Sequence, residues 1–238
     1  MRLIMPDPYF KFKRFTIYHD KCAMKVGTDG VLLGAWTDVN NSKKILDIGT
    51  GSGLIALMLA QRCEASITAI DIDMEAVEQA QTNIEATEWK DRMEVLHTDL
   101  CKFTPQYLFD TIVSNPPYFI DSLKCDDIQR NTARHNDTLT SDDLFKNVSR
   151  MLSPEGEFSL IIPFDQTESA ISIAEKYGLY PRRHTQVITR PGLFPKRSLL
   201  AFGKHPSTYT TQDLVIELER HVYSEDYIAL TKEFYLKM

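Results

Sequence analysis

The sequence predicts an α/β protein built on a seven-stranded, mostly parallel sheet with helices on both faces. Short β-branched runs alternate with helical segments from about residue 43 to residue 205. This alternation is typical of a parallel sheet, because its crossover helices cover both faces. A length of 238 residues suits a single core. We therefore predict one domain over residues 1–238, with an arm and cap at 1–42, the sheet at 43–205 and an extension at 206–238.

The expected elements follow from hydrophobic periodicity and turn signals. Strands are expected at residues 43–49, 66–71, 93–98, 109–114, 157–162, 180–189 and 198–203. Helices are expected at 54–63, 74–87, 141–152, 166–177 and 224–237, and an edge strand or hairpin is expected at 9–18. Gly178 is placed to cap the fourth helix. The segment 119–140 has no clear period, and such long loops are usually functional or mobile.

The composition, with 43% hydrophobic and 25% charged residues, is that of an ordinary soluble protein. The apolar run at 54–60 is much shorter than the roughly 20 residues that cross a membrane. Residues 1–25 lack the apolar stretch of a signal peptide. The four cysteines are unevenly spaced and form no C-x-x-C pair. We expect a cytoplasmic monomer that binds neither a membrane nor a metal.

The charge is unevenly distributed along the chain. Residues 182–204 carry six basic side chains and no acid, and residues 9–25 carry five basic side chains and one acid. These segments contribute +6 and +4 to a formal charge of −6, which leaves −16 for the rest of the chain. Positive potential could therefore gather on one face of an acidic body and attract phosphates. The alternative is that these charges are scattered over the surface.

A glycine-rich turn joins an apolar strand to a helix, in the order Asp47-Ile48-Gly49-Thr50-Gly51-Ser52-Gly53. Its G-x-G-x-G spacing differs from the G-x-G-x-x-G of dinucleotide-binding proteins. It resembles the nucleotide loop of the Rossmann-like class I methyltransferases, which implies contacts with the methionyl part of S-adenosylmethionine. The residues so implicated are Asp47, Gly49, Thr50, Gly51 and Gly53. A plain strand-to-helix turn is the alternative interpretation.

Two further acids stand at the ends of the next two strands. Asp71 ends the second strand of the series, where a carboxylate can accept hydrogen bonds from both ribose hydroxyls. Asp73 is better explained as the N-cap of the following helix. Asp99 ends the third strand, at the position where methyltransferases commonly hold the cofactor's adenine, although loop aspartates are also frequent in turns. The neighbouring Ile72 and Leu100 are assigned to the same cofactor site.

The most informative motif is Asn115-Pro116-Pro117-Tyr118, directly after the fourth strand of the core. Two prolines fix the backbone and remove two donors, so that carbonyl groups stay available as acceptors. If Asn115 and the Pro116 carbonyl each accept one hydrogen of an adenine amine, its nitrogen lone pair becomes exposed for attack on a methyl sulfonium. Tyr118 would stack on the extruded base. A rigid loop without such a role is the alternative.

The segments His19–Trp36 and Tyr223–Leu236, together with the glycine turn and Asn115–Tyr118, resemble the bacterial tRNA1(Val) adenine-37 N6-methyltransferase family. The resemblance runs from about Phe12 to the end. It implies a tRNA substrate, S-adenosylmethionine as cofactor and S-adenosylhomocysteine as product. It also implies that Thr28 and Asp29 close over the methionyl end, although residues 27–30 could form a simple turn. Trp36 is expected in the core. The candidate RNA contacts are Lys124, Arg130, Arg134, Arg182, Arg183, Lys196 and Arg197.

Three other functions remain open. A DNA adenine methyltransferase would share the Asn-Pro-Pro-Tyr motif, but such enzymes normally carry extra surface to read bases. A protein-glutamine methyltransferase would present a side-chain amide of the same geometry to the same pocket. A non-catalytic RNA-binding or cofactor-sensing module could retain the fold without the activity.

Overall fold

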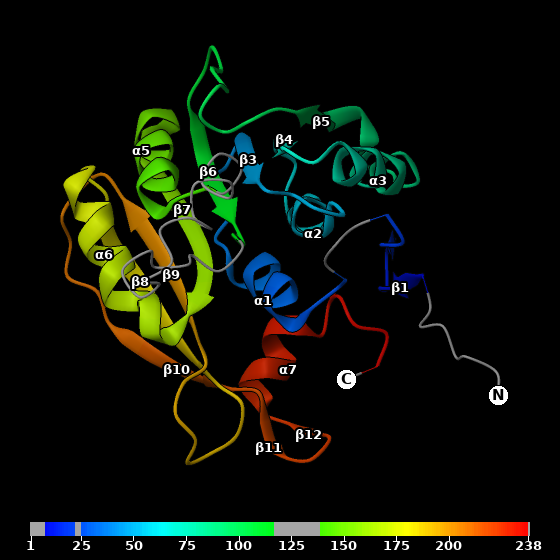
Figure 1. Ribbon diagram of the computed structural model, residues 1–238. Helices are drawn as coiled ribbons and strands as arrows, with labels where there is room; N and C mark the ends of the chain where they lie inside the picture. Colours follow the sequence, from blue (N-terminus) through cyan, green and yellow to red (C-terminus); the bar gives the residue numbers. More distant parts are fainter. Residues whose placement is uncertain (1–7, 22–24, 117–138, 238) are drawn as a thin grey trace, which may run out of the picture.

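The computed structural model of the protein describes residues 8–21, 25–116 and 139–237. Its central sheet has eight strands in the order β10-β8-β9-β7-β6-β3-β4-β5 (Figure 1). Only β9 runs antiparallel to its neighbours. The strands are β3 (Lys44–Ile48), β4 (Ser66–Asp71), β5 (Met93–His97), β6 (Phe109–Ser114), β7 (Leu152–Pro163), β8 (Tyr180–Ile188), β9 (Arg197–Gly203) and β10 (Thr211–Val215). The expected mostly parallel α/β architecture is confirmed, with one strand more than the seven predicted.

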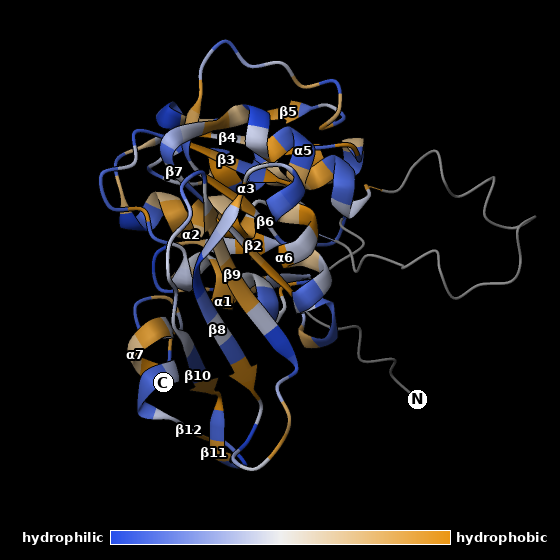
Figure 2. Ribbon diagram, turned by 90° about the vertical axis from the view of Figure 1, so that its left-hand side faces the viewer, coloured by the Kyte–Doolittle hydropathy of each residue, from blue (hydrophilic) through white to orange (hydrophobic). Residues whose placement is uncertain are grey.

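Helices cover both faces of the sheet. Successive residues of a strand contribute to two different apolar clusters, one on each face of the sheet. Ile45 therefore packs on one face and Leu46 on the other. Along the chain the helices are α1 (Thr28–Trp36), α2 (Leu54–Arg62), α3 (Met74–Glu85), α5 (Ser141–Met151), α6 (Thr167–Lys176) and α7 (Glu225–Thr231), with 3-10 turns at Lys90–Arg92 and Phe164–Gln166. α1 and α2 lie on one face, and α5 and α6 on the other (Figure 1). The central strands consist mostly of hydrophobic residues, which are orange in Figure 2.

The two ends of the described chain pack together on the α1 and α2 face. The expected hairpin forms from β1 (Tyr9–Lys11) and β2 (Thr16–Tyr18). Phe12 makes a β-bridge with Tyr235, and the Lys13 amide donates to the Phe234 carbonyl at 2.8 Å. These pairings replace helical hydrogen bonds near the C-terminus. The last helix, expected at 224–237, therefore ends at Thr231.

Two elements were not predicted from the sequence. The eighth strand, β10, joins the sheet by parallel pairing with β8. A small hairpin then follows from β11 (Glu217–Glu219) and β12 (Val222–Tyr223). Gly178, by contrast, has φ +70° and donates to the Glu175 carbonyl, which confirms its role as the cap of α6. In the described part of the chain, no helix is long and apolar enough to cross a membrane.

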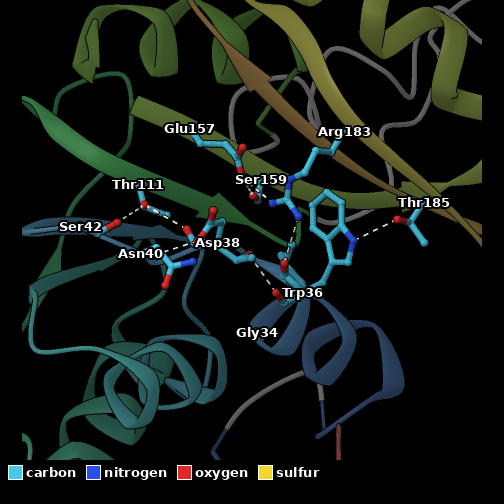
Figure 3. A network of polar contacts seen from close by, with 12 residues as sticks. Gly34, Trp36, Asp38, Asn40, Ser42, Thr111, Glu157, Ser159, Arg183 and Thr185 are labelled. Atoms are coloured by element: carbon cyan, nitrogen blue, oxygen red, sulfur yellow. Dashed lines mark hydrogen bonds and ion pairs between the residues drawn. The ribbon is translucent and has the colours of Figure 1, made fainter. Parts of the chain in front are cut away.

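Two arginines anchor the carboxyl end of α1. The Arg62 guanidinium donates to the carbonyl oxygens of Gly34 and Thr37 at 2.8 and 2.7 Å. The Arg183 guanidinium lies over the Trp36 ring, 4.0 Å from its centroid, and pairs with Glu157 at 2.6 Å (Figure 3). Cations are stabilising at this end of a helix, where unpaired carbonyl groups gather. Trp36 therefore packs against the core while also being held by polar contacts.

α1 packs closely on α2 because position 34 carries no side chain. A Cβ added at Gly34 would lie 2.9 Å from the Cβ of Met58, and real Cβ atoms essentially never approach so closely. The close packing fixes where the amino end of α1 lies relative to the turn that precedes α2.

We expect Gly34→Ala to lower the free energy of unfolding by about 1–3 kcal/mol, because overpacking outweighs the gain in helix propensity. Urea denaturation would measure the change. In a Met58→Ala background the cost of Gly34→Ala should be smaller, since that change removes the sulfur and terminal carbon that the new methyl group meets at 2.8 and 3.2 Å, although the Met58 Cβ remains. Strictly additive effects of the two substitutions would contradict this explanation.

Candidate active site

The glycine turn after β3 adopts a conformation that only glycine tolerates well. Gly49, Gly51 and Gly53 have φ values of +70°, +55° and +81°, in the left-handed region. The amides of Gly49 and Thr50 donate to the Ile70 carbonyl of β4, which ties the turn to the sheet. A Cβ built on Gly49 or Gly51 would meet no atom within 4 Å. The backbone of the turn therefore borders open space that a ligand can enter.

The buried side chain of Asp47 accepts hydrogen bonds that fix the conformation of this turn. Its side chain is fully buried, and one carboxylate oxygen, Oδ2, accepts hydrogen bonds from the Thr50 hydroxyl at 2.7 Å and from the Ala56 amide at 3.2 Å. The other oxygen, Oδ1, is buried and has no hydrogen-bond partner. Burial raises the pKa of Asp47 to about 7, with a smaller contribution from the nearby charge of Asp71, although the two hydrogen bonds oppose the increase.

The turn forms one wall of a cleft of about 370 Å³, which falls within the size range of small-molecule sites. The amino end of α1 forms the opposite wall. The structure thus brings Thr28 and Asp29 to the glycine turn and to Asn115, as the sequence led us to expect. The lining also contains residues that sequence analysis did not single out, namely Lys25, Gly27, Gly30, Ser52, Leu54 and Ile55. The residue types at these positions do not by themselves indicate a binding site.

The acids at the strand ends are positioned by backbone hydrogen bonds. Asp71 accepts from the Gly51 amide at 2.8 Å and from the Asp73 amide at 3.0 Å, so its carboxylate lies against the glycine turn. Asp73 accepts from the Glu75 amide, which confirms it as the N-cap of α3. Asp99 accepts from the Cys101 amide at 2.8 Å, and its carboxylate also faces Lys102. The Asp99 side chain therefore closes a turn in the chain after β5.

The two hydrophobic neighbours of these acids differ in exposure. Ile72 is 57% exposed beside the carboxyl end of β4, and its carbonyl contacts the His97 ring at 2.9 Å. The Leu100 side chain is buried in the core cluster beneath α5. Only the backbone of Leu100 is therefore available for a contact with a ligand.

Asn115 and Pro116 follow β6 directly. Ser114 fixes the end of this strand, because its hydroxyl donates to the Ile48 carbonyl of β3 at 3.0 Å. Asn115 is half-buried and lines the cleft, whereas Pro116 is buried. The remaining motif residues, Pro117 and Tyr118, lie outside the described residues, as do the candidate RNA contacts Lys124, Arg130 and Arg134.

The four basic candidates of the sheet do not come together. β8 runs parallel to β7, so Arg182 and Arg183 lie in the amino-terminal half of β8, where Arg183 pairs with Ala201 in the middle of β9. Lys196 precedes β9 and Arg197 begins it, at the carboxyl edge where the cleft opens. The Arg197 guanidinium pairs with Asp29 at 2.7 Å, which joins β9 to the cleft wall. No local signal in the sequence links these two residues, which are 168 positions apart.

Three carboxylates near this cleft, although not among the residues that line it, favour a ligand with positive charge and hydroxyl groups. A buried carboxylate oxygen without a partner, at Asp47, lies beneath a turn whose glycines face open space. Two more carboxylates, Asp71 and Asp99, follow neighbouring strands at the same sheet edge. Within the described ranges, no group of three or more His, Cys, Asp or Glu side chains could hold a metal ion.

Comparison with known proteins gives consistent results. Residues 24–178 match the family model of the methyltransferase small domain. The chain is 61% identical to the tRNA1(Val) (adenine(37)-N6)-methyltransferase of Phocaeicola vulgatus, covering 98% of this chain and all of that protein. It is 41% identical to the protein of the same name from Tolumonas auensis, with 96% and 97% covered. A predicted O-methyltransferase from Agrobacterium tumefaciens shares the fold, with a TM-score of 0.67, 22% identity, and 87% and 96% coverage.

We expect the burial of Asp47 to make the ligand-free protein less stable as pH rises. Its pKa is near 3.8 when unfolded and about 7 when folded, so the folded state binds more protons between these values. Its contribution to the free energy of unfolding should therefore fall across this range, by about 4 kcal/mol at most. Denaturation of the parent and of Asp47→Asn from pH 4 to pH 8 measures it.

Asp47→Asn should gain stability relative to the parent as pH rises, because an amide carries no buried charge. Asp110→Asn is a suitable control, since that carboxylate accepts from the Lys43 and Lys44 amides at the opposite edge of the sheet. A constant difference between parent and Asp47→Asn at every pH would show that Asp47 does not titrate in this range.

Proposed function

Because the chain belongs to the family of tRNA1(Val) (adenine(37)-N6)-methyltransferases, we propose that it transfers a methyl group from S-adenosylmethionine to N6 of adenine 37 in that tRNA. The observation that carries this proposal is the position of Asn115, which lines the same cleft as the glycine turn. A candidate acceptor for an adenine amine thus stands at the edge of a site suited to the cofactor. Parallel α/β sheets bind ligands at this carboxyl edge.

The proposed cofactor site uses the residues of three strand ends. When bound, S-adenosylmethionine supplies a methyl group on a positively charged sulfur. The glycine turn allows close approach to its methionyl part, and a bound cation would favour the charged form of the Asp47 carboxyl beneath the turn, whose pKa burial raises to about 7. The carboxylate of Asp71, already oriented by the Gly51 amide, is proposed to accept from the ribose hydroxyls. Asp99 is proposed to lie beside the adenine of the cofactor.

Asn115 and Pro116 are proposed to hold the target adenine. An exocyclic amine is a poor nucleophile, because its lone pair is delocalised into the ring. Two carbonyl acceptors draw its hydrogens out of the ring plane, which exposes the lone pair for transfer. Fixing both reactants in this way can lower a barrier by roughly 7–11 kcal/mol at the favourable limit. No general base is needed beforehand, since the product ammonium is acidic and releases its proton to water.

Several parts of this proposal rest on the sequence. Stacking of Tyr118 on the extruded base remains a prediction, as do a monomeric state and a cytoplasmic location. The names of the relatives support tRNA as the substrate. Methylation of a protein glutamine or of DNA adenine would use the same amine geometry, and both are outcomes of the experiment below.

We expect the purified protein, given labelled S-adenosylmethionine and total tRNA from a strain that lacks it, to form N6-methyladenosine at position 37 of one valine tRNA. Nucleoside mass spectrometry after digestion, with mapping of the labelled fragment, identifies the atom and the site. Parallel reactions contain DNA or cell protein in place of tRNA. Label in DNA or protein, with none in tRNA, would overturn the proposed substrate.

We expect Asn115→Ala and Asp71→Ala to separate transfer from cofactor binding. Asn115→Ala should lower kcat by about 100-fold or more while leaving cofactor affinity nearly unchanged, because it removes an acceptor for the amine. Asp71→Ala should weaken cofactor binding by roughly tenfold or more, because two hydroxyl groups lose a charged acceptor. Calorimetry and steady-state kinetics measure the two effects.

Asp73→Ala is a matched control for Asp71→Ala, because it removes a neighbouring carboxylate whose contact is with α3. It should cost about 1 kcal/mol of stability without a comparable loss of cofactor affinity. If Asp71→Ala binds the cofactor as tightly as the parent, the ribose assignment is wrong.

A further inference from the structure

Phe194 is the most exposed large hydrophobic side chain in the described part of the protein, at 88%. It lies in the loop of residues 189–196 that joins β8 to β9, next to Leu193, which is 52% exposed. Exposing a phenylalanine ring to water is unfavourable, because burial of its apolar surface would lower the free energy. Single exposed apolar side chains are common on protein surfaces, so the significance of Phe194 depends on the geometry and charge of its loop.

The backbone of this loop fixes the position of the ring. The Leu193 amide donates to the Arg190 carbonyl, which closes a turn that includes Gly192 at φ +78°. The Lys196 amide then donates to the Val187 carbonyl at 2.8 Å, which returns the chain to β8. Prolines at positions 191 and 195 restrict the backbone on either side. The loop therefore presents Phe194 in a defined place, and a partner would order little on binding.

Basic side chains flank the ring. Arg190 lies before it, Lys196 and Arg197 lie after it, and the loop contains no acid. Arg190 also pairs with Glu217, and the Glu217 amide donates to the Thr189 carbonyl, so the loop lies beside the β11–β12 hairpin (Figures 1 and 2). An aromatic ring between cations is the combination by which proteins bind single-stranded nucleic acid.

The loop lies close to the cleft. Arg197, three residues after Phe194, contacts Asp29 of the cleft wall at 2.7 Å. Three residues of extended chain span at most about 11 Å, so the backbone of Phe194 lies within that distance of Arg197. A nucleotide near the adenine in the cleft could therefore reach the ring.

From these observations we infer that Phe194 is a stacking platform for an unpaired base of the RNA substrate, close in sequence to the methylated adenine. Arg190 and Lys196 contact the phosphates on either side of that base. The inference rests on the proposed function, because it takes the occupant of the loop to be tRNA. It assigns to this rigid loop a recognition role distinct from the chemistry at Asn115.

The test compares the parent with Phe194→Ala, Phe194→Trp and Leu108→Ala. Leu108 is a matched control, because it is 44% exposed at the opposite edge of the sheet, just before β6. Binding of unmodified valine tRNA is measured by fluorescence anisotropy at one fixed salt concentration, together with the KM and kcat for methylation. Cofactor affinity and the sedimentation coefficient are measured for each variant as checks on folding and assembly.

Loss of one stacked base predicts that Phe194→Ala weakens tRNA binding by about 5- to 150-fold, mainly through KM. Phe194→Trp should bind within about threefold of the parent, and tRNA should quench the fluorescence of the added indole. Leu108→Ala should behave as the parent does. Unchanged affinity in Phe194→Ala, or an added indole that tRNA does not quench, would overturn the inference.

Two further outcomes separate the possible failures. If the parent is a dimer and Phe194→Ala is a monomer, the ring belongs to an interface between copies of the chain, and the stacking role is wrong. If the parent transfers no methyl group to tRNA, the proposed function fails, whichever result the loop variants give. If the parent methylates tRNA and Phe194→Ala does so with the same KM, only the stacking inference fails.

Discussion

The site depends on one buried carboxylate. Asp47 is the penultimate residue of β3, and its carboxylate accepts from Thr50 in the glycine turn and from Ala56 in the first turn of α2. Without these two hydrogen bonds, the three alternating left-handed glycines would be held only by the contacts of the turn with Ile70 and Asp71. Burial of this charge lowers the stability of the folded protein at the same place where a cation is proposed to bind. The stability of the fold and the affinity for the ligand are therefore linked through one side chain.

The opposite wall of the cleft depends on contacts that are remote in sequence. α1 is held at its carboxyl end by Arg62 and Arg183 and is pressed onto α2 at Gly34. At its amino end, the ion pair between Asp29 and Arg197 joins it to β9. The helix thus runs from the network in Figure 3 to the cleft. The position of Asp29 therefore depends on the packing of α1 along its whole length.

The sequence was informative where local chemistry determines the structure. The glycine turn, the cap at Asp73 and the apolar strands could be predicted, because turn geometry, capping and periodicity act over a few residues. β10 could not, since its sequence Thr211–Val215 is short and mostly polar and becomes a strand only by pairing with β8. The separation of Arg183 from Arg197 could not be predicted either, because the antiparallel pairing of β8 with β9 sets them about four residues apart along the strands.

The hydrogen bond from the Gly51 amide to Asp71 also bears on which nucleotides the proposed cofactor site would accept. It holds a negative charge against the turn, so a phosphate placed there would meet repulsion at short range. A phosphate on the ribose hydroxyls that Asp71 is proposed to bind would be disfavoured in this way, by charge rather than by shape.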